Sequence, residues 1–230
     1  MNNKLINDRS FEEYFSKYPV VLLDCGFRGG VQDKWKVFDK YLGIVAFEPD
    51  RDEYEALLKK FPVHKVFATA LYKECTDDLT LFITRSRALC SIFEPDKQLL
   101  SEFPESERFD IVDIKKIKAD TLDNVMRNTD IDNIDFMKID TQGSELFVLQ
   151  GAINTLKGPV FGIEIEVEYQ PIYRQQPLFA DVDDFVRKYG FQLFDLRNYF
   201  WKRKAGVGLD DLKRGQLIHA DALYLRDADI

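Results

Sequence analysis

Short apolar runs alternate with amphipathic stripes along most of this 230-residue chain. The apolar run at 20–23 stops at an aspartate followed by glycines, which is typical of a buried parallel strand. Apolar residues that recur every three or four positions predict helices instead. The predicted strands are residues 20–23, 44–47, 63–69, 79–84, 111–117, 134–139, 160–165, 191–196 and 222–225. The predicted helices are residues 11–18, 35–42, 54–61, 121–128, 146–156 and 182–189.

The repeated strand–helix units predict an α/β fold with a doubly wound, mostly parallel sheet and helices on both faces. A loop at 198–216, rather than a helix, joins the last two strands, so these should pair antiparallel at the sheet edge. Residues 96–109 are polar and acidic and are expected to form a mobile flap. No linker or repeat divides the chain, which predicts one domain over 1–230, with an amino-terminal helical extension at 1–19 and a core at 20–226.

Composition narrows the class of protein. The net charge of −8 argues against non-specific binding to nucleic acid, which needs a basic surface, and the basic segment 201–204 is more typical of a solvated loop. Three cysteines without CxxC spacing predict reduced thiols in a cytoplasmic protein. His64 and His219 lie too far apart in the sequence to predict a zinc site. Neither a signal peptide nor an apolar run of about 20 residues is evident, so no membrane span is expected.

Three predicted strands end at an acidic residue, namely Asp24, Glu48 and Asp140. The carboxyl ends of parallel strands form the ligand site in doubly wound folds, so these carboxylates should lie together. The turn Asp24-x-Gly26-x-x-Gly29 has an aspartate where a dinucleotide fingerprint has its first glycine. That carboxylate would repel a pyrophosphate but attract the ammonium and sulfonium of S-adenosylmethionine. Gly26 and Gly29 would let the backbone approach this cofactor closely.

Glu48 lies 24 positions after Asp24, near the spacing of about 20 residues expected for an acid that binds ribose hydroxyls. Its two oxygens can accept hydrogen bonds from both hydroxyls. The alternative is a helix cap or a solvated turn acid before Pro49, because Glu-Pro-Asp is common turn chemistry. The preceding Asp24 turn favours ribose binding, with Pro49 beside the cofactor.

The segment 134–152, IDFMKIDTQGSELFVLQGA, places a strand, an aspartate, a glycine and a glutamate in close succession. It resembles the signature of the FkbM family of S-adenosylmethionine-dependent methyltransferases. The resemblance covers roughly residues 20–226. Other similar segments are 21–29, 46–49, 121–123, 173–184, 190–191, 215–216 and 221–223. The resemblance implies the Rossmann-like class I methyltransferase fold with seven strands, and it implies Asp24, Gly26 and Glu48 as cofactor residues.

The sequence departs from the family pattern in several places. Phe27 and Arg28 stand where members often carry a small residue and an asparagine. Gln142 replaces the usual acid two residues after the strand-end aspartate. The family also commonly carries a longer amino-terminal extension. These departures leave cofactor binding as expected but weaken any prediction of the acceptor.

The predicted reaction is O-methylation of a hydroxylated small molecule, such as a sugar or a secondary metabolite. A hydroxyl acceptor benefits from a general base, and Asp140 is the candidate for this catalytic role. Asp140 is also assigned to cofactor binding, and capping of the next helix is the alternative. Glu145, in the first turn of that helix, is more typical of dipole stabilisation. Asp140 with a later glutamate would suit a divalent metal, but without a tighter acid cluster we expect none.

A second group of acids follows the strand predicted at 160–165. Alternation places Glu164, Glu166 and Glu168 on one side of an extended segment. Glu166, with Tyr169 and Tyr173, is expected to line a pocket for the acceptor. A solvated sheet edge is the alternative interpretation.

Two other functions fit parts of the pattern. A nicotinamide-dependent oxidoreductase would share the fold, but Asp24 and the lack of an obvious Tyr-x-x-x-Lys pair oppose it. A catalytically silent cofactor-binding module would explain Phe27, Arg28 and Gln142. We therefore expect S-adenosylmethionine as cofactor and a small-molecule acceptor as partner, without nucleic acid. The sequence leaves open whether the chain forms a homo-oligomer.

Overall fold

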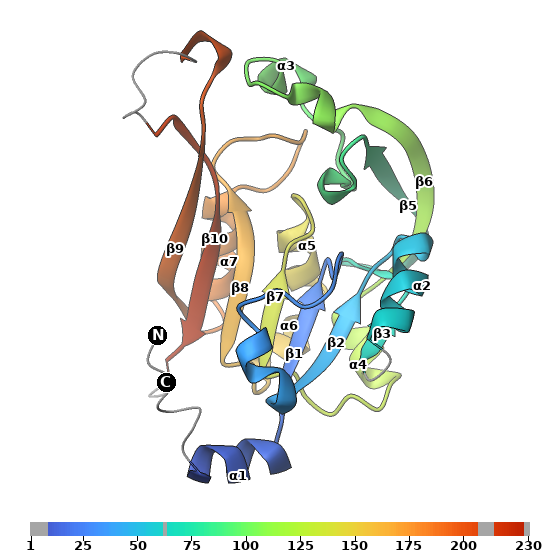
Figure 1. The fold of residues 1–230 in the computed structure, drawn as a ribbon, viewed down its shortest axis with the longest axis vertical. Helices are drawn as coiled ribbons and strands as arrows, with labels where there is room; N and C mark the ends of the chain where they lie inside the picture. The colour runs from blue at the N-terminus through green and yellow to red at the C-terminus, as the bar shows by residue number, and fades with distance from the viewer. Residues whose placement is uncertain (1–8, 62–63, 207–213, 228–230) are drawn as a thin grey trace.

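The structure is a computed structural model that describes residues 9–61, 64–206 and 214–227. The main sheet has seven strands in the order β3-β2-β1-β7-β8-β10-β9 (Figure 1). These strands are β1 (Val20–Cys25), β2 (Leu42–Phe47), β3 (Lys65–Phe67), β7 (Phe136–Ile139), β8 (Gly162–Glu168), β9 (Phe191–Trp201) and β10 (Gln216–Arg226). The pairs from β3 to β8 are parallel, whereas β10 is antiparallel to both β8 and β9. The predicted α/β class, with a mostly parallel seven-stranded sheet and an antiparallel edge, is confirmed.

Helices cover both faces of this sheet. The α-helices of the described residues are α1 (Arg9–Lys17), α2 (Arg51–Lys60), α3 (Lys97–Leu100), α4 (Leu122–Arg127), α5 (Glu145–Gln150), α6 (Ile153–Lys157) and α7 (Phe179–Arg187). Of these, α3 lies beyond the sheet faces, in a separate apolar cluster. Short 3-10 helices are η1 (Lys36–Tyr41), η2 (Arg87–Leu89), η3 (Ser106–Phe109) and η4 (Lys204–Gly206). The segment predicted as a helix at 35–42 is therefore helical, but it has the tighter 3-10 geometry.

Alternation along β2 shows how the two faces are filled. Val45 and Phe47 belong to the main core, which also contains the apolar side chains of α4, α5, α6 and α7. Ile44 and Ala46 face the opposite side, where they pack with Leu57 of α2. Because both faces are covered, β1, β2 and β7 are apolar and buried along most of their length.

A second, three-stranded sheet lies beyond the carboxyl ends of β1 and β2 (Figure 1). It contains β4 (Ala70–Leu71), β5 (Thr76–Thr84) and β6 (Ile111–Asp120) in the order β4-β6-β5. The strands predicted at 79–84 and 111–117 therefore lie outside the main sheet. Leu81, Ile83 and Ile117 form a small core of their own.

Residues 96–109 are packed, so the predicted mobile flap is wrong. Leu100, Phe103 and Phe109 are only 2–3% exposed and pack with Tyr173. These apolar side chains are spaced among many charged residues, which hides them in a composition-based prediction. Burial of each large apolar side chain contributes about 1.5–3 kcal/mol, enough to hold the segment against the protein.

Two predicted elements have different boundaries in the structure. The helix predicted at 146–156 is divided into α5 and α6 around Gly151. A side chain at Gly151 would collide with the carbonyl oxygen of Tyr72, so the close approach of these two segments requires glycine at this position. β9 continues into the loop predicted at 198–216 as far as Trp201, and β10 begins at its last residue, Gln216, because the antiparallel pairing continues to these two residues. The strand predicted at 222–225 is therefore the end of a longer strand.

Some predicted segments fall partly outside the described residues. These are residues 1–8 of the amino-terminal extension, the start of the strand predicted at 63–69, and residues 207–213 of the predicted loop.

Candidate active site

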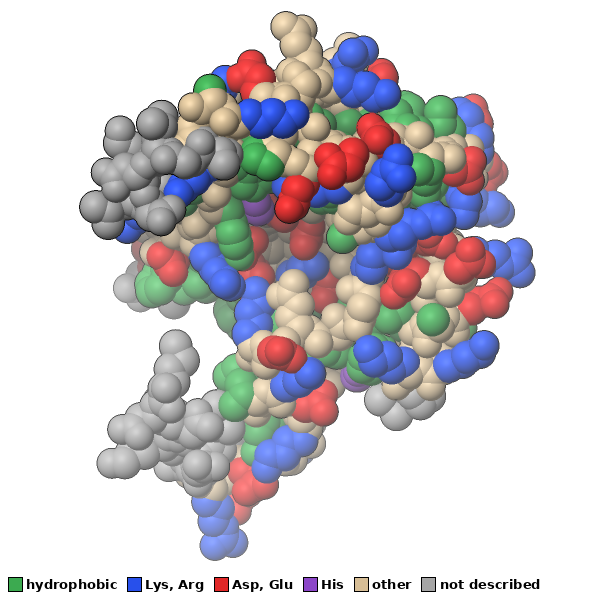
Figure 2. Space-filling view, turned by 45° about the horizontal axis from the view of Figure 1, so that its top comes forward, with side chains coloured by type: hydrophobic (Ala, Val, Ile, Leu, Met, Phe, Trp, Pro, Cys, Tyr) green, Lys and Arg blue, Asp and Glu red, His purple; other side chains and the backbone are tan. Residues whose placement is uncertain are grey.

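A cavity of about 410 Å³ lies between the carboxyl ends of the parallel strands and the three-stranded sheet. Figure 2 shows this side of the molecule hollowed, with acidic and basic side chains at the bottom of the recess. Small-molecule sites have volumes of about 300–1,000 Å³, so the cavity is of suitable size. The β2 end is lined by Phe47, Glu48, Pro49, Leu71, Leu81 and Ile117. The β10 end is lined by Phe109, Glu166, Ile172, Trp201 and His219.

Two strand-end carboxylates share one buried lysine in the floor between these ends. Lys138 of β7 lies 3.3 Å from Asp24 Oδ1 and 3.4 Å from Asp140 Oδ2. Burial acts to lower the pKa of Lys138, but the carboxylates of Asp140 and Asp24 outweigh it and raise that pKa. Burial also raises the pKa of Asp24 to about 6, against the lowering effect of Lys138. Asp140 lines the cavity, whereas Asp24 is 2% exposed and lies beneath the lining.

Gly26 joins the turn after β1 to the turn after β7. Its φ of +85° is in the left-handed region, and a side chain there would collide with the carbonyl oxygen of Asp140. Gly26 lines the cavity, as expected for a cofactor residue. Gly29 lies outside the lining and donates its backbone N–H to Glu53 at 3.0 Å.

The turn after β2 presents a buried carboxylate to the cavity. Glu48 is 4% exposed, and its Oε1 accepts the backbone N–H of Asp50 at 2.9 Å. Burial raises the pKa of Glu48 to about 6. Asp50, not Glu48, caps α2, since its side chain accepts the backbone N–H of Asp52. The structure therefore removes the helix-cap alternative for Glu48, and Pro49 lines the cavity beside it.

Arg28, one of the departures from the family pattern, lies beside this turn. Its guanidinium lies 3.8 Å from Glu48, 3.3 Å from Asp50 and 3.5 Å from Glu53. A cation beside three carboxylates relieves their mutual repulsion. Phe27, the adjacent departure, is 1% exposed and belongs to the core on the α2 side of the sheet.

The turn after β7 is held by the carboxylate of Glu145. Its Oε1 accepts the backbone N–H groups of Thr141 at 2.7 Å and Gly143 at 3.2 Å, and also the Thr141 hydroxyl at 3.1 Å. Burial raises the pKa of Glu145 to about 7. Its hydrogen bonds place Glu145 in the framework of the turn rather than in the cavity lining.

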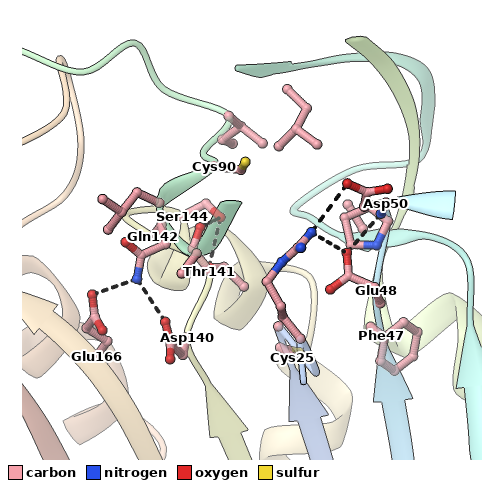
Figure 3. Close-up of a pocket in the computed structure, with 18 of the residues that line it drawn as sticks. Cys25, Phe47, Glu48, Asp50, Cys90, Asp140, Thr141, Gln142, Ser144 and Glu166 are labelled. Atoms are coloured by element: carbon pink, nitrogen blue, oxygen red, sulfur yellow. Dashed lines mark hydrogen bonds and ion pairs between the residues drawn. The ribbon is translucent and has the colours of Figure 1, made fainter. Parts of the chain in front are cut away.

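Gln142, the third departure, connects the two ends of the cavity (Figure 3). Its Nε2 donates to Asp140 Oδ1 and to Glu166 Oε1, both at 3.0 Å. Its Oε1 accepts the hydroxyl of Tyr173 at 3.1 Å. An acid at this position would place a third carboxylate between two others, whereas the amide supplies the donor that both need. The glutamine is thus well suited to this site.

The three glutamates of β8 lie in different environments. Glu164 pairs with Lys34 away from the cavity lining, Glu166 lines the cavity, and Glu168 is buried with 1% exposure. Burial, followed by the neighbouring acids, raises the pKa values of Glu166 and Glu168 well above their ordinary value. The predicted acceptor residues Tyr169 and Tyr173 lie outside the lining.

These two tyrosines have structural positions instead. The Tyr169 ring packs on Phe179 with centroids 5.2 Å apart. The single hydrogen of the buried Tyr173 hydroxyl is shared between two acceptors, the carbonyl oxygen of Leu89 at 3.0 Å and Gln142 Oε1 at 3.1 Å. Tyr173 therefore supports the site from behind, so its assignment as a contact of the acceptor does not follow from this geometry.

Several lining residues were not predicted from the sequence. His219 and Trp201 come from strands β10 and β9, and Phe109 and Ile172 come from segments that pack against them. No short sequence motif marks these four residues. They come together only because the strands at the antiparallel edge pair with one another. The available indications were the aromatic residues 199–201 and the apolar residues 217–218, and these point to strands rather than to a site.

The described residues contain neither a metal cluster nor a membrane helix. Within 9–61, 64–206 and 214–227, no group of three or more His, Cys, Asp or Glu side chains could hold a metal ion. No described helix combines the length and apolar character that crossing a bilayer requires.

Comparisons with known proteins place the fold. The family model described as the Methyltransferase FkbM domain matches residues 21–193, which confirms the resemblance found in the sequence. The methyltransferase FkbM from Methylobacillus flagellatus KT is 15% identical with a TM-score of 0.52; the match covers 90% of this chain and 43% of that chain. The chain thus spans less than half the length of the Methylobacillus protein. No curated protein matches the sequence.

Two further structures are more distant. Magnesium protoporphyrin IX methyltransferase (ChlM) from Synechocystis PCC 6803, with bound SAM, is 6% identical with a TM-score of 0.45, covering 95% of this chain and 77% of that one. A TehB-like SAM-dependent methyltransferase from Corynebacterium glutamicum ATCC 13032 is 11% identical with a TM-score of 0.43, covering 96% and 90%.

Proposed function

The chain belongs to the FkbM family of S-adenosylmethionine-dependent methyltransferases, and we propose that it methylates a hydroxyl group of a small molecule, such as a sugar or a secondary metabolite. The observation that carries this proposal is the single cavity shared by Glu48, Asp140, Glu166 and His219. A methyl donor at the β2 end and an acceptor at the β10 end would meet there beside Asp140.

The residues of the β2 end fit S-adenosylmethionine. Glu48 Oε1 accepts a backbone N–H, and the carboxylate retains acceptor capacity for ribose hydroxyls. Leu71, Leu81 and Ile117 offer apolar surface for the adenine ring. Asp140, at the carboxyl end of β7, is the lining carboxylate that we assign to the ammonium group. The bound cofactor supplies an activated methyl group, while the protein supplies alignment and excludes water.

The β10 end suits a hydroxylated acceptor. Glu166 and His219 provide hydrogen-bond acceptors for hydroxyl groups, and Phe109 and Trp201 provide aromatic faces for the apolar side of a ring. The arrangement of a few polar groups in a largely apolar wall is typical of small-molecule sites. It supports an acceptor that carries both hydroxyls and an apolar face.

We assign Asp140 to cofactor positioning rather than to base catalysis. One of its oxygens accepts from Gln142, and the other lies 3.4 Å from Lys138. Both carboxylate oxygens are therefore already engaged by neighbouring protein groups. Asp140→Asn should therefore weaken binding of S-adenosylhomocysteine. A loss of turnover with unchanged affinity would contradict this assignment.

The proposed function is tested by product release. The full chain is incubated with S-adenosylmethionine and a panel of sugars, hydroxylated aromatic compounds, amines and carboxylic acids, and release of S-adenosylhomocysteine is measured. We expect release above the acceptor-free blank with hydroxylated acceptors. The matched control is the methyl ether of each active acceptor, which should return release to the blank.

Other outcomes choose between alternatives. Release only with amines or carboxylic acids would overturn hydroxyl methylation. If no acceptor raises the release of S-adenosylhomocysteine above the acceptor-free blank, although calorimetry shows that S-adenosylhomocysteine binds, the catalytically silent module would be favoured.

A further inference from the structure

Strands β8 and β10 extend beyond the floor of the cavity and form its wall. β7 ends at Ile139, which pairs with Ile165, but β8 continues to Glu168. Along this extension, His219 of β10 pairs with Glu168, and the next residue pair on the same face is Asp221 with Glu166. His219 and Glu166 are therefore diagonal neighbours on the cavity side, past the end of the parallel strands.

The imidazole of His219 is held in a fixed orientation. Its ring stacks on Tyr199 with centroids 4.5 Å apart and an angle of 7° between planes, and it meets the Trp201 ring edge-on at 6.2 Å. Nδ1 is buried without a hydrogen-bond partner among the described residues. It lies 4.0 Å from Glu166 Oε2, an ion-pair separation. Because the ring lines the cavity and Nδ1 is buried, Nε2 is the nitrogen that faces the cavity.

Glu166 is itself oriented from the opposite side. Its Oε1 accepts from Gln142 Nε2 at 3.0 Å, which leaves Oε2 toward His219. Gln142 is fixed in turn by Asp140 and by the Tyr173 hydroxyl. A carboxylate oxygen 4.0 Å from Nδ1 is too far to accept a hydrogen bond, but its charge favours a proton on that nitrogen, which leaves Nε2 as the proton acceptor. The chain therefore contains a carboxylate–imidazole pair directed at the β10 end.

We propose that His219, oriented by Glu166, is the general base that removes the acceptor's hydroxyl proton during methyl transfer. This inference rests on the proposed hydroxyl methylation. The acceptor oxygen forms a bond to the methyl carbon as the carbon–sulfur bond breaks and its electron pair passes to sulfur. The hydroxyl proton moves to Nε2 of His219. S-adenosylhomocysteine and the methyl ether leave, and His219 returns the proton to solvent.

The charges around His219 are compatible with this role. Burial, as the largest effect, lowers the pKa of His219, Asp221 and Asp140 raise it, and Arg108 lowers it. The net direction is downward, so the imidazole is neutral at pH 7 and able to accept a proton. The imidazolium that forms would lie 4.0 Å from Glu166 Oε2, within ion-pair distance.

Neighbouring groups are less suitable as the base. The Tyr199 hydroxyl donates to Asp221 at 2.9 Å. Glu168 is buried outside the lining, and Asp140 is paired with Lys138. Among the lining residues at the β10 end, His219 is the one that combines a cavity-facing nitrogen with a carboxylate behind it.

The first test measures the tautomer of His219 and needs neither cofactor nor acceptor. The chain has two histidines, so ¹⁵N-histidine labelling of the full chain gives two imidazoles, and His64→Gln identifies the His219 signals by elimination. We expect His219 at pH 7.5 to carry its proton on Nδ1, with Nε2 unprotonated. Glu166→Gln should lower the His219 pKa, because the carboxylate charge is lost. A proton on Nε2 in the unmodified chain would overturn the proposal, as would a pKa that Glu166→Gln leaves unchanged.

The second test uses the acceptor identified by product release. His219→Gln should lower kcat by about 10²–10⁴-fold, the usual contribution of a general base. Its Kd for S-adenosylhomocysteine should stay within about twofold of the original, which also reports that the variant folds. Glu166→Gln should lower kcat less and shift the acidic limb of the pH–rate profile. His64→Gln should retain full activity.

The outcomes separate this inference from the proposed function. Equal turnover by His219→Gln and the unmodified chain would overturn the inference and leave hydroxyl methylation intact. Failure of every hydroxylated acceptor would overturn the proposed function, and the tautomer measurement would still decide whether the Glu166–His219 pair exists.

Discussion

The β2 end of the cavity is made from short turns, whereas the β10 end is made from segments far apart in the sequence. Turns directly after β1, β2 and β7 supply Gly26, Glu48 and Asp140. The β10 end combines η3, β8, β9 and β10, and its polar pair, Glu166 and His219, is 53 positions apart in the sequence. The first end depends on local backbone geometry, and the second depends on antiparallel pairing.

This difference indicates how the two ends can change. The strand-end turns contact one another through the backbone, as Gly26 does with Asp140, so a side chain added in one turn disturbs the next. Long strands and covering segments can accept other side chains without moving the floor. We therefore expect substitutions at the β2 end to alter stability and cofactor affinity, and substitutions at the β10 end to alter turnover and acceptor choice.

The largest effect is expected at Lys138, in the floor between the two ends. Lys138→Met leaves Asp24 and Asp140 without their shared cation. Removal of one partner of a buried ion pair typically costs about 3–5 kcal/mol, which urea unfolding at pH 8 would measure. The control Lys188→Met removes an exposed pair with Asp184 and should cost less than about 1 kcal/mol. Equal losses in the two variants would contradict the assignment of Lys138.

The Lys138→Met loss should also depend on pH. The pKa of Asp24 is already raised to about 6 in the folded chain, above its ordinary value of 3.8, and loss of the cation raises it further. A carboxyl with a raised folded pKa stabilises the fold below its unfolded pKa and loses that contribution as pH rises through the folded pKa. The loss should therefore be smaller at pH 5 than at pH 8.

The next effect is expected at Gly26. Gly26→Ala combines a positive φ, which costs about 1–2 kcal/mol, with a collision against Asp140, which costs about 1–3 kcal/mol. Urea unfolding should show both. Gly190→Ala is the matched control, because Gly190 has a φ of +84° but a Cβ added there would meet no atom within 4 Å. If the two variants lose equal stability, the contact between the turns is not important.

A smaller effect is expected at Glu48. Glu48→Gln keeps the shape of the side chain but replaces one acceptor oxygen with a donor, so one ribose hydroxyl loses its partner. The affinity for S-adenosylhomocysteine should weaken by about 1–3 kcal/mol in a calorimetric titration. An unchanged affinity would return Glu48 to the alternative of a turn acid.

The smallest effect is the pH dependence of cofactor affinity. In the proposed role, ribose hydroxyls would donate to the ionised form of Glu48, whose pKa burial raises to about 6. The affinity should therefore fall as pH decreases through about 6, by up to about tenfold per pH unit. Glu48→Gln should lack this dependence. A wild-type affinity that is constant between pH 5 and 7.5 would contradict the ribose-binding role.

The same contrast explains what the sequence predicted. Asp24, Glu48 and Asp140 each follow an apolar run, so strand periodicity alone brought them to one edge of the sheet. Their detailed roles needed the structure, because Lys138 lies under two of them and Arg28 pairs with the third. The sequence shows that Lys138 lies within an apolar strand, but it does not show which side chains this lysine contacts.

The β10 end was largely missed, for a physical reason. His219 acquires its position from pairing with β8 and β9, which periodicity cannot specify between segments that far apart. Glu166 was predicted to line the pocket because alternation along one strand depends only on residues adjacent in the sequence. Tyr173 was near enough in sequence to be named, but its side chain points behind Gln142 rather than into the lining.

The most direct test of the two-ended cavity is one calorimetric series with S-adenosylhomocysteine. The unmodified chain, Glu48→Gln and His219→Gln are titrated at pH 7.5 under identical conditions. The account predicts one site per chain, an affinity weakened by about 1–3 kcal/mol in Glu48→Gln, and an affinity within about twofold of the original in His219→Gln. Equal weakening in both variants, or no binding to the unmodified chain at millimolar concentration, would contradict it.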